Sequence, residues 1–167
     1  MVRQPDLPAQ RAAMSRLGFL VGVWAGEASI TPPGGGAAIE LNQTEIVEFK
    51  LEGLILSIEG IGRSSTDGRA VLQAFAIISF DDETISYRMR AFNDGRYLET
   101  DVTLANDGKG ITWGFELGPV KTSSVLRITE AGEWTEVTEL AIGSDAPQKY
   151  MEVCVRPRVR SYSVGVA

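Results

Sequence analysis

The sequence predicts an all-β protein, a closed antiparallel up-and-down β-barrel of roughly ten strands with a short N-terminal helix closing one end. Three observations lead to this fold. Turn signals such as "SSTDGR", "NDGR" and "NDGKG" recur at intervals of roughly 8–12 residues from Leu20 onward. The segments between them alternate apolar and polar residues, as half-buried strands do. All connections are short, which favours an order in which consecutive strands pair.

Composition limits the function classes that fit the chain. Its 167 residues and net charge of −6 suit one acidic domain. An acidic chain without a long basic run is not expected to bind nucleic acid or an anionic membrane surface. The absence of histidine excludes imidazole zinc sites, histidine-ligated haem and Ser-His catalysis. We expect no metal site and no cofactor. No secretion signal or membrane span is recognisable, so a cytoplasmic location is expected.

Residues 1–19 are predicted to form the helix and its lead-in. Asp6 is suited to cap the helix, Pro8 fits its first turn, and Gly18 ends the pattern. Residues 20–158 follow as the barrel, in a single domain with the helix, and residues 159–167 are expected to be a loose tail. The stretch 69–80 is apolar on both faces, so its outer face needs a cover. The helix or a second subunit could supply it, and a homodimer is the favoured expectation.

The two-residue period of a strand assigns side chains to the barrel interior. In residues 110–117, Ile111, Trp113, Phe115 and Leu117 share one face. In residues 84–92, Arg88 and Arg90 face outward. The inner faces of the other segments are expected to comprise Ile39, Leu41, Gln43, Glu45, Val47 and Phe49; Ile85, Tyr87, Met89 and Ala91; Leu98, Val102 and Leu104; Thr122, Ser124, Leu126 and Ile128; and Trp134, Glu136, Thr138, Leu140 and Ile142.

Several of the expected inner positions are polar. They are Gln43, Glu45, Tyr87, Thr100, Thr122, Ser124, Glu136 and Thr138. A buried polar group costs about 1–3 kcal/mol when it has no partner, so a dry core is not expected to select this set. A cavity that holds water, or a ligand with a polar edge, is expected to have such polar residues on its wall. A register error of one residue would instead turn the polar set outward.

The stretch "FLVGVWAGEAS" carries a resemblance to a known group of proteins. Gly22, Val23 and Trp24 resemble the Gly-x-Trp of calycin-type barrels, the lipocalins and fatty-acid-binding proteins, which follows a short N-terminal helix. The longer Gly-x-Trp-x-Gly-Glu is more similar to nitrobindin-like bacterial barrels and a related uncharacterised bacterial family, as are "SYRMRAF", "DGRYLETDV" and "ITWGFEL". The resemblance implies the fold and an internal cavity, with Trp24 as a plug beneath the helix. Gly22 and Gly26 would let the first strand bend around it.

The departure from that family bears directly on function. Nitrobindin-like barrels hold haem through a histidine near the last strands, and this chain has no histidine. Haem binding in their manner is therefore not implied.

The sequence favours a binding protein for a small, mostly apolar or amphipathic ligand. The predicted ligand-binding residues are Gln43, Glu45, Tyr87, Met89, Trp113, Phe115, Trp134 and Glu136. The alternative is a cofactor-free isomerase, cyclase or hydrolase that uses Glu45 or Glu136 as base and Tyr87 as acid or oxyanion donor. A carboxyl in an apolar barrel either has a raised pKa or makes a structural hydrogen bond, and both readings stay open. A third possibility is a structural or dimerising barrel with a filled interior.

Overall fold

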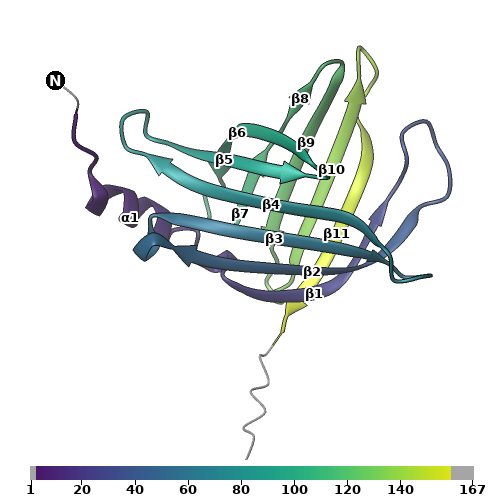
Figure 1. Ribbon diagram of the computed structural model, residues 1–167, viewed down its shortest axis with the longest axis horizontal. Coiled ribbons are helices and arrows are strands. Elements are labelled where there is room, and N and C mark those ends of the chain that lie inside the picture. Colours follow the sequence, from purple (N-terminus) through teal and green to yellow (C-terminus); the bar gives the residue numbers. More distant parts are fainter. Residues whose placement is uncertain (1–2, 159–167) are drawn as a thin grey trace, which may run out of the picture.

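The computed structural model describes residues 3–158, so the predicted tail over 159–167 lies outside the described residues. Within these residues, one α-helix and eleven strands make up the fold (Figure 1). Their bounds are α1 Leu7–Ser15, β1 Gly22–Ile30, β2 Ile39–Lys50, β3 Ile55–Ser64, β4 Ala70–Asp81, β5 Ser86–Asn93, β6 Arg96–Leu104, β7 Gly110–Trp113, β8 Glu116–Leu117, β9 Val120–Ile128, β10 Trp134–Ile142 and β11 Gln148–Pro157. Short 3₁₀ helices cover Gly18–Leu20 and Leu51–Gly53.

The strands close into an antiparallel barrel. Consecutive strands pair from β1 to β7, β9 pairs with β7 and β10, and β1 pairs with β11 to complete the ring. The two-residue β8 pairs with the same strand as β7, from which Gly114 and Phe115 separate it. β7 and β8 therefore occupy one position in the barrel. The predicted ten-stranded up-and-down barrel with one N-terminal helix is confirmed.

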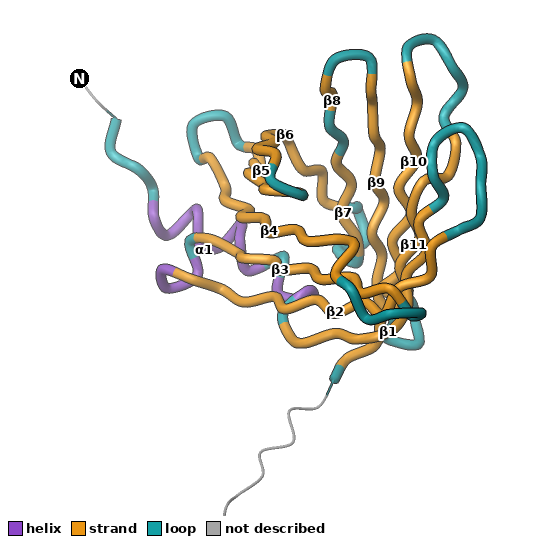
Figure 2. The backbone as a smooth tube through the Cα atoms, turned by 45° about the vertical axis from the view of Figure 1, so that its right-hand side comes forward, coloured by secondary structure: helices purple, strands orange, loops and turns teal. Residues whose placement is uncertain are grey.

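The pairing between β6 and β7 is short. Only Thr103 with Thr112 and Leu104 with Ile111 are partners across this seam. Beyond it the hairpin of β8 and β9 diverges from the hairpin of β5 and β6 (Figure 2). The barrel is thus least tightly joined near the turn residues 93–96 and 117–120, which also bound its internal cavity.

The helix forms and docks for identifiable reasons. The Asp6 carboxylate caps α1 by accepting a hydrogen bond from the backbone N–H of Ala9 at 3.0 Å, as predicted. Asp82, in the turn after β4, holds the helix against the barrel. It accepts hydrogen bonds from the backbone of Asp6 at 3.0 Å and from Gln10 Nε2 at 2.6 Å.

Apolar side chains seal the barrel beneath the helix. Met14, Leu17 and Leu20 are fully buried. Trp24 packs below them and donates from Nε1 to the carbonyl oxygen of Leu20 at 2.9 Å. Its ring meets that of Trp134 edge-on, with centroids 5.6 Å apart. Trp24 therefore has the surroundings of a plug at the closed end of the barrel.

The two glycines beside Trp24 act differently from one another. Gly22 has a φ of +144°, a conformation that other residues rarely adopt. At Gly26, a Cβ atom would collide with the carbonyl oxygen of Cys154 on the neighbouring strand. Gly26 is therefore required for the close approach of β1 and β11, and the expected bend of the first strand at this glycine stays a prediction.

Some expected inner positions lie at strand ends and face solvent instead. Ile85 is 72% exposed because it lies in the turn before β5 with a φ of +54°. Ile39 and Ile142, at the first and last positions of their strands, are also exposed. The alternation holds only where pairing on both sides keeps the strand in the barrel wall.

The outer face of β4 is not covered by the helix. α1 lies next to the C-terminal end of β4 (Figure 1), whereas Phe75, on the outer face of that strand, is 40% exposed. The helix therefore closes the barrel end only. No helix among residues 3–158 is long and apolar enough to cross a membrane.

Candidate ligand-binding cavity

The barrel interior contains a cavity of about 480 Å³. Its apolar lining includes Met89, Trp113, Phe115 and Leu126, contributed by strands on opposite sides of the barrel. It extends to the turns after β5 and β8, where Arg96 and Leu117 line it and are exposed. The space is therefore closed beneath the helix and reaches the surface at the other end.

Most of the predicted site residues meet in this cavity. Those that line it are Gln43, Glu45, Met89, Trp113, Phe115, Trp134 and Glu136. Tyr87 is not among the lining residues. It lies two residues before Met89 on β5, closer to the helix. Its hydroxyl donates to the carbonyl oxygen of Ala13 at 2.7 Å. Its hydroxyl therefore anchors α1, and its predicted part in ligand binding stays a prediction.

Hydroxyl groups form a second polar cluster on the cavity wall. Ser124 Oγ and Thr138 Oγ1 lie 2.7 Å apart on the paired strands β9 and β10. Thr122 accepts a hydrogen bond from the backbone of Phe115 at 3.1 Å across the interruption between β7 and β8. Thr122, Ser124 and Thr138 were expected to face inward, and all three line the cavity. Thr100 was also expected to face inward but does not line the cavity.

Two glycines of β3 make room for the most polar part of the cavity. Gly60 is the cross-strand neighbour of Glu45, and Gly62 is that of Gln43. A Cβ atom at Gly60 would lie 2.7 Å from Glu45 Oε2. The side chains of Gln43 and Glu45 therefore occupy space that any larger residue on β3 would fill. The signal in the sequence is the pair of glycines two residues apart in "EGIGR", which sequence reasoning did not connect to the site.

We call Gln43, Glu45 and Glu136 the acceptor cluster. Each is more than nine-tenths buried. Gln43 Nε2 donates to Glu45 Oε1 at 2.6 Å, and Trp134 Nε1 donates to Glu136 Oε2 at 3.3 Å. Among the described residues, Gln43 Oε1 and the second oxygen of each carboxyl have no hydrogen-bond partner. The cluster is therefore rich in free acceptors.

The acceptor cluster lies at the plugged end of the cavity. Glu45 is the cross-strand neighbour of Trp24. Trp134, which donates to Glu136, packs edge-on against the same Trp24 ring. The apolar residues Phe115 and Leu117 lie toward the turns at the opposite end. A molecule in this cavity would meet carboxyl groups at its depth and apolar side chains toward the mouth.

Burial shifts the ionisation of both carboxyl groups. Removal from water raises the pKa of Glu45 to about 8, with repulsion from Glu136 adding to the rise and the hydrogen bond from Gln43 opposing it. Burial likewise raises the pKa of Glu136 to about 7, against the hydrogen bond from Trp134. Both carboxyl groups therefore titrate near neutrality. Of residues 3–158, Arg96 at the mouth is the only basic one that lines the cavity.

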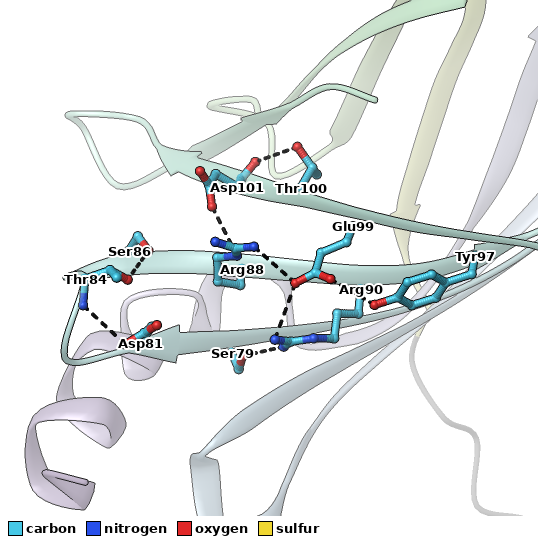
Figure 3. Close-up of polar contacts among 10 residues, drawn as sticks. All are labelled: Ser79, Asp81, Thr84, Ser86, Arg88, Arg90, Tyr97, Glu99, Thr100 and Asp101. Atoms are coloured by element: carbon cyan, nitrogen blue, oxygen red, sulfur yellow. Dashed lines mark hydrogen bonds and ion pairs between the residues drawn. The ribbon is translucent and has the colours of Figure 1, made fainter. Parts of the chain in front are cut away.

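Carboxylates on the outside of the barrel have the opposite surroundings. Glu99, on the outer face of β6, lies 3.1 Å from Arg88 and 3.5 Å from Arg90 (Figure 3). It also accepts a hydrogen bond from the Tyr97 hydroxyl at 3.0 Å. The hydrogen bonds from Tyr97 and Arg88 hold the pKa of Glu99 below its ordinary value. Arg88 and Arg90 face outward, as the alternation of β5 predicts.

The described residues contain no group of three or more His, Cys, Asp or Glu side chains placed to hold a metal ion. The cavity instead presents two carboxyl groups and an amide. Their chemistry is that of hydrogen-bond acceptors and of acids or bases.

Comparison with known proteins relates the chain to others by fold. No protein-family model matches the sequence, and no curated protein matches it. Among solved structures, Rv2717c from M. tuberculosis aligns with a TM-score of 0.70 at 13% identity, over 88% of this chain and 98% of that one. The S-type phycobiliprotein lyase CPES from Guillardia theta aligns with a TM-score of 0.62 at 9% identity, over 95% of this chain and all of that one. At these identities the likeness shows the fold alone, a closed antiparallel β-barrel.

Proposed function

We propose that this protein binds a small, mostly apolar molecule inside its barrel. The observation that carries the proposal is the cavity of about 480 Å³, lined by apolar side chains and by one buried cluster of free acceptors. Ligand sites in proteins typically combine an apolar lining with a few polar groups that fix orientation. A barrel with a merely structural role would have a filled interior, and this one does not.

The comparisons are consistent with this function. One neighbour of the fold is named as a lyase of phycobiliproteins, so a barrel of this shape can carry an activity. We also propose that the chain is related to nitrobindin-like barrels, because residues 22–27 and the later segments resemble theirs. A cytoplasmic location is a separate proposal, based on the sequence patterns described above. Histidine-ligated haem is not part of the proposal, because the chain has no histidine.

The test uses N-phenyl-1-naphthylamine, a neutral apolar dye whose fluorescence rises in apolar surroundings. We expect saturable binding at one site and a loss of about tenfold or more in affinity for Ala91→Phe, because Ala91 is buried and lines the cavity. Phe92→Ala is the matched control, since Phe92 adjoins Ala91 but is 55% exposed on the outer face. Dye binding that ignores Ala91→Phe, or that Phe92→Ala removes, would place the dye outside the barrel and contradict the proposal.

A second candidate function uses the same cavity for general acid–base catalysis. The pKa values of about 8 and about 7 for Glu45 and Glu136 favour it, because a general acid or base is most effective when its pKa lies near the working pH. With Tyr87 bound to Ala13, the two carboxyl groups would have to supply both acid and base. Turnover that Glu45→Gln or Glu136→Gln abolishes while binding persists would support catalysis, and unchanged turnover would contradict it.

The expected homodimer also belongs among the proposals. Phe75, Phe92 and Tyr97 are cross-strand neighbours on the outer faces of β4, β5 and β6, and each is at least 40% exposed. Such a row is typical of an interface. The molar mass in solution, measured by light scattering, would contradict the dimer if it equalled that of one chain.

A further inference from the structure

The acceptor cluster also restricts the kind of head group that the cavity suits. Inside the barrel, Gln43, Glu45 and Glu136 offer oxygen atoms without partners. Most of the donors nearby are already engaged. Gln43 Nε2 is bound to Glu45, and Trp134 Nε1 to Glu136. Among the described residues, the deep end of the cavity therefore offers a ligand acceptor oxygens without partners, while the side chains of Gln43 and Trp134 each already donate a hydrogen bond within it.

The charges that line the cavity point the same way. The ionisable residues on its lining are Glu45 on β2, Glu136 on β10, Tyr150 on β11, and Asp94 and Arg96 at the turn after β5. Only the last is cationic, and it is exposed at the mouth. A buried carboxylate without a counter-ion is costly, and a hydrogen-bonded cation offsets that cost. An anionic head group at the same depth would be repelled by Glu45 and Glu136 in their ionised form.

We infer that the ligand carries a protonated nitrogen, a primary ammonium or an amidinium, on an apolar body, and that this nitrogen binds between Glu45 and Glu136 at the plugged end. The inference rests on the proposed function and names the ligand's chemical class. Charge-assisted N–H···O bonds to the free carboxyl oxygens would hold the head group. The apolar body would lie against Phe115 and Trp113 toward the mouth.

Gln43 has a positioning part in this arrangement. Its amide, 1% exposed, donates to Glu45 Oε1 and so leaves Oε2 as the free oxygen beside Gly60. The absence of a side chain at Gly60 keeps that oxygen unobstructed. The glycines of β3, the amide and the carboxyl group together form a pocket built for a donor.

Binding should release protons. Before binding, burial and the mutual repulsion of Glu45 and Glu136 favour the neutral acids. A cation between them favours the ionised form, so it would displace protons from the pair. Affinity for the cation should therefore rise between about pH 6 and about pH 8.5, while a neutral ligand should show no such rise.

Three probes with one apolar body and different head groups test the inference: 4-phenylbutylamine, 4-phenylbutan-1-ol and 4-phenylbutyrate. Isothermal titration calorimetry at about pH 8 should show the amine binding about tenfold or more tighter than the alcohol, and the carboxylate weakest. Titrations in buffers of different ionisation enthalpy should show proton release with the amine alone. Equal binding of all three, or tighter binding of the carboxylate, would overturn the inference.

Variants place the effect in the acceptor cluster. Glu45→Gln with Glu136→Gln should lower the amine's affinity to about that of the alcohol and leave the alcohol unchanged. Glu99→Gln is the matched control, since it removes an outer carboxylate and should change neither. Amine preference that survives the double variant would contradict the inference. In that case, binding of N-phenyl-1-naphthylamine would still support the proposed function, whereas its absence would remove both.

Discussion

Two glutamates of the barrel have opposite surroundings: Glu99 lies on the outer face of β6, and Glu45 lies on the inner face of β2. The outer carboxylate has two arginines within 3.5 Å, and its pKa lies below the ordinary value (Figure 3). The inner carboxyl group has an amide donor and, within the part of the chain that the structure describes, no cation beside it, and its pKa is raised to about 8. Outside, the fold supplies the counter-charge; inside, it does not.

The difference does not come from a shortage of cations near the cavity. Arg88 and Arg90 lie on β5, where they alternate with Met89 and Ala91. The latter two line the cavity, while the arginines pair with Glu99 and Asp101 on the outer surface. One strand thus places its cations outside and its apolar residues inside. A counter-ion for the inner carboxyl groups would have to come from a bound molecule, which is the basis of the inference above.

The largest expected effect follows from removing both inner carboxyl groups. The folded pKa values of Glu45 and Glu136 lie above the ordinary value of 4.5, so the folded state binds more protons than the unfolded state between those limits. The free energy of unfolding should therefore fall as the pH rises from about 5 to about 8. Each pKa unit corresponds to about 1.4 kcal/mol, so the loss should reach a few kcal/mol at alkaline pH.

Glu45→Gln with Glu136→Gln should remove most of that fall. The measurement is urea unfolding of both proteins at several pH values, each compared with its own value near pH 5. A wild-type protein whose stability stays constant over this range would show that the inner carboxyl groups find a counter-charge in the fold itself. The contrast with Glu99 would then disappear.

A second, smaller effect concerns the space in which the inner carboxyl group lies. Gly60→Ala introduces a Cβ atom about 2.7 Å from Glu45 Oε2, so the carboxyl group must move. We expect a loss of about 1–3 kcal/mol in the free energy of unfolding, as for other overpacked interiors. In a Glu45→Ala background the loss should be smaller, because the obstructing atoms are gone.

Gly18→Ala is the matched control for this change. A Cβ atom at Gly18 would have no neighbouring side chain or strand within 4 Å, and the φ of Gly18 is not positive. Its substitution by alanine should therefore be nearly neutral. Equal effects of Gly60→Ala in the two backgrounds would show that the glycine serves the strand rather than the carboxyl group.

The contrast between the two faces of the barrel also marks how far the sequence predicts the molecule. Strand alternation predicts the inward direction of Glu45 and Glu136, because neighbours on both sides keep these strands in register. It fails for Ile85, where the chain leaves the barrel wall in a turn with positive φ. Local pattern carries no information about where a strand ends to within one or two residues.

Strand alternation also does not predict how deep along the barrel axis a residue lies. Tyr87 and Met89 are on the same face of β5, yet Tyr87 binds the helix and Met89 lines the cavity. The tilt of strands in a barrel and the position of the helix decide this, and both depend on contacts far apart in the sequence. The role of Gly60 is likewise visible only once β2 and β3 are paired.

The smallest expected effect belongs to the outer carboxylate. Glu99→Gln removes an exposed partner of Arg88 and Arg90, and such surface pairs contribute little and are screened by salt. The sign of its pH dependence is opposite to that of the inner pair. Because the folded pKa of Glu99 lies below its ordinary value, its contribution is present above about pH 4.5 and is lost as the pH falls through the folded pKa. Thermal melts of wild type and Glu99→Gln should therefore differ slightly at neutral pH in low salt, and converge both in about 1 M salt and in acid. A difference that persists in high salt, or that grows toward alkaline pH as expected for Glu45, would mean that the outer network is held by more than its charges.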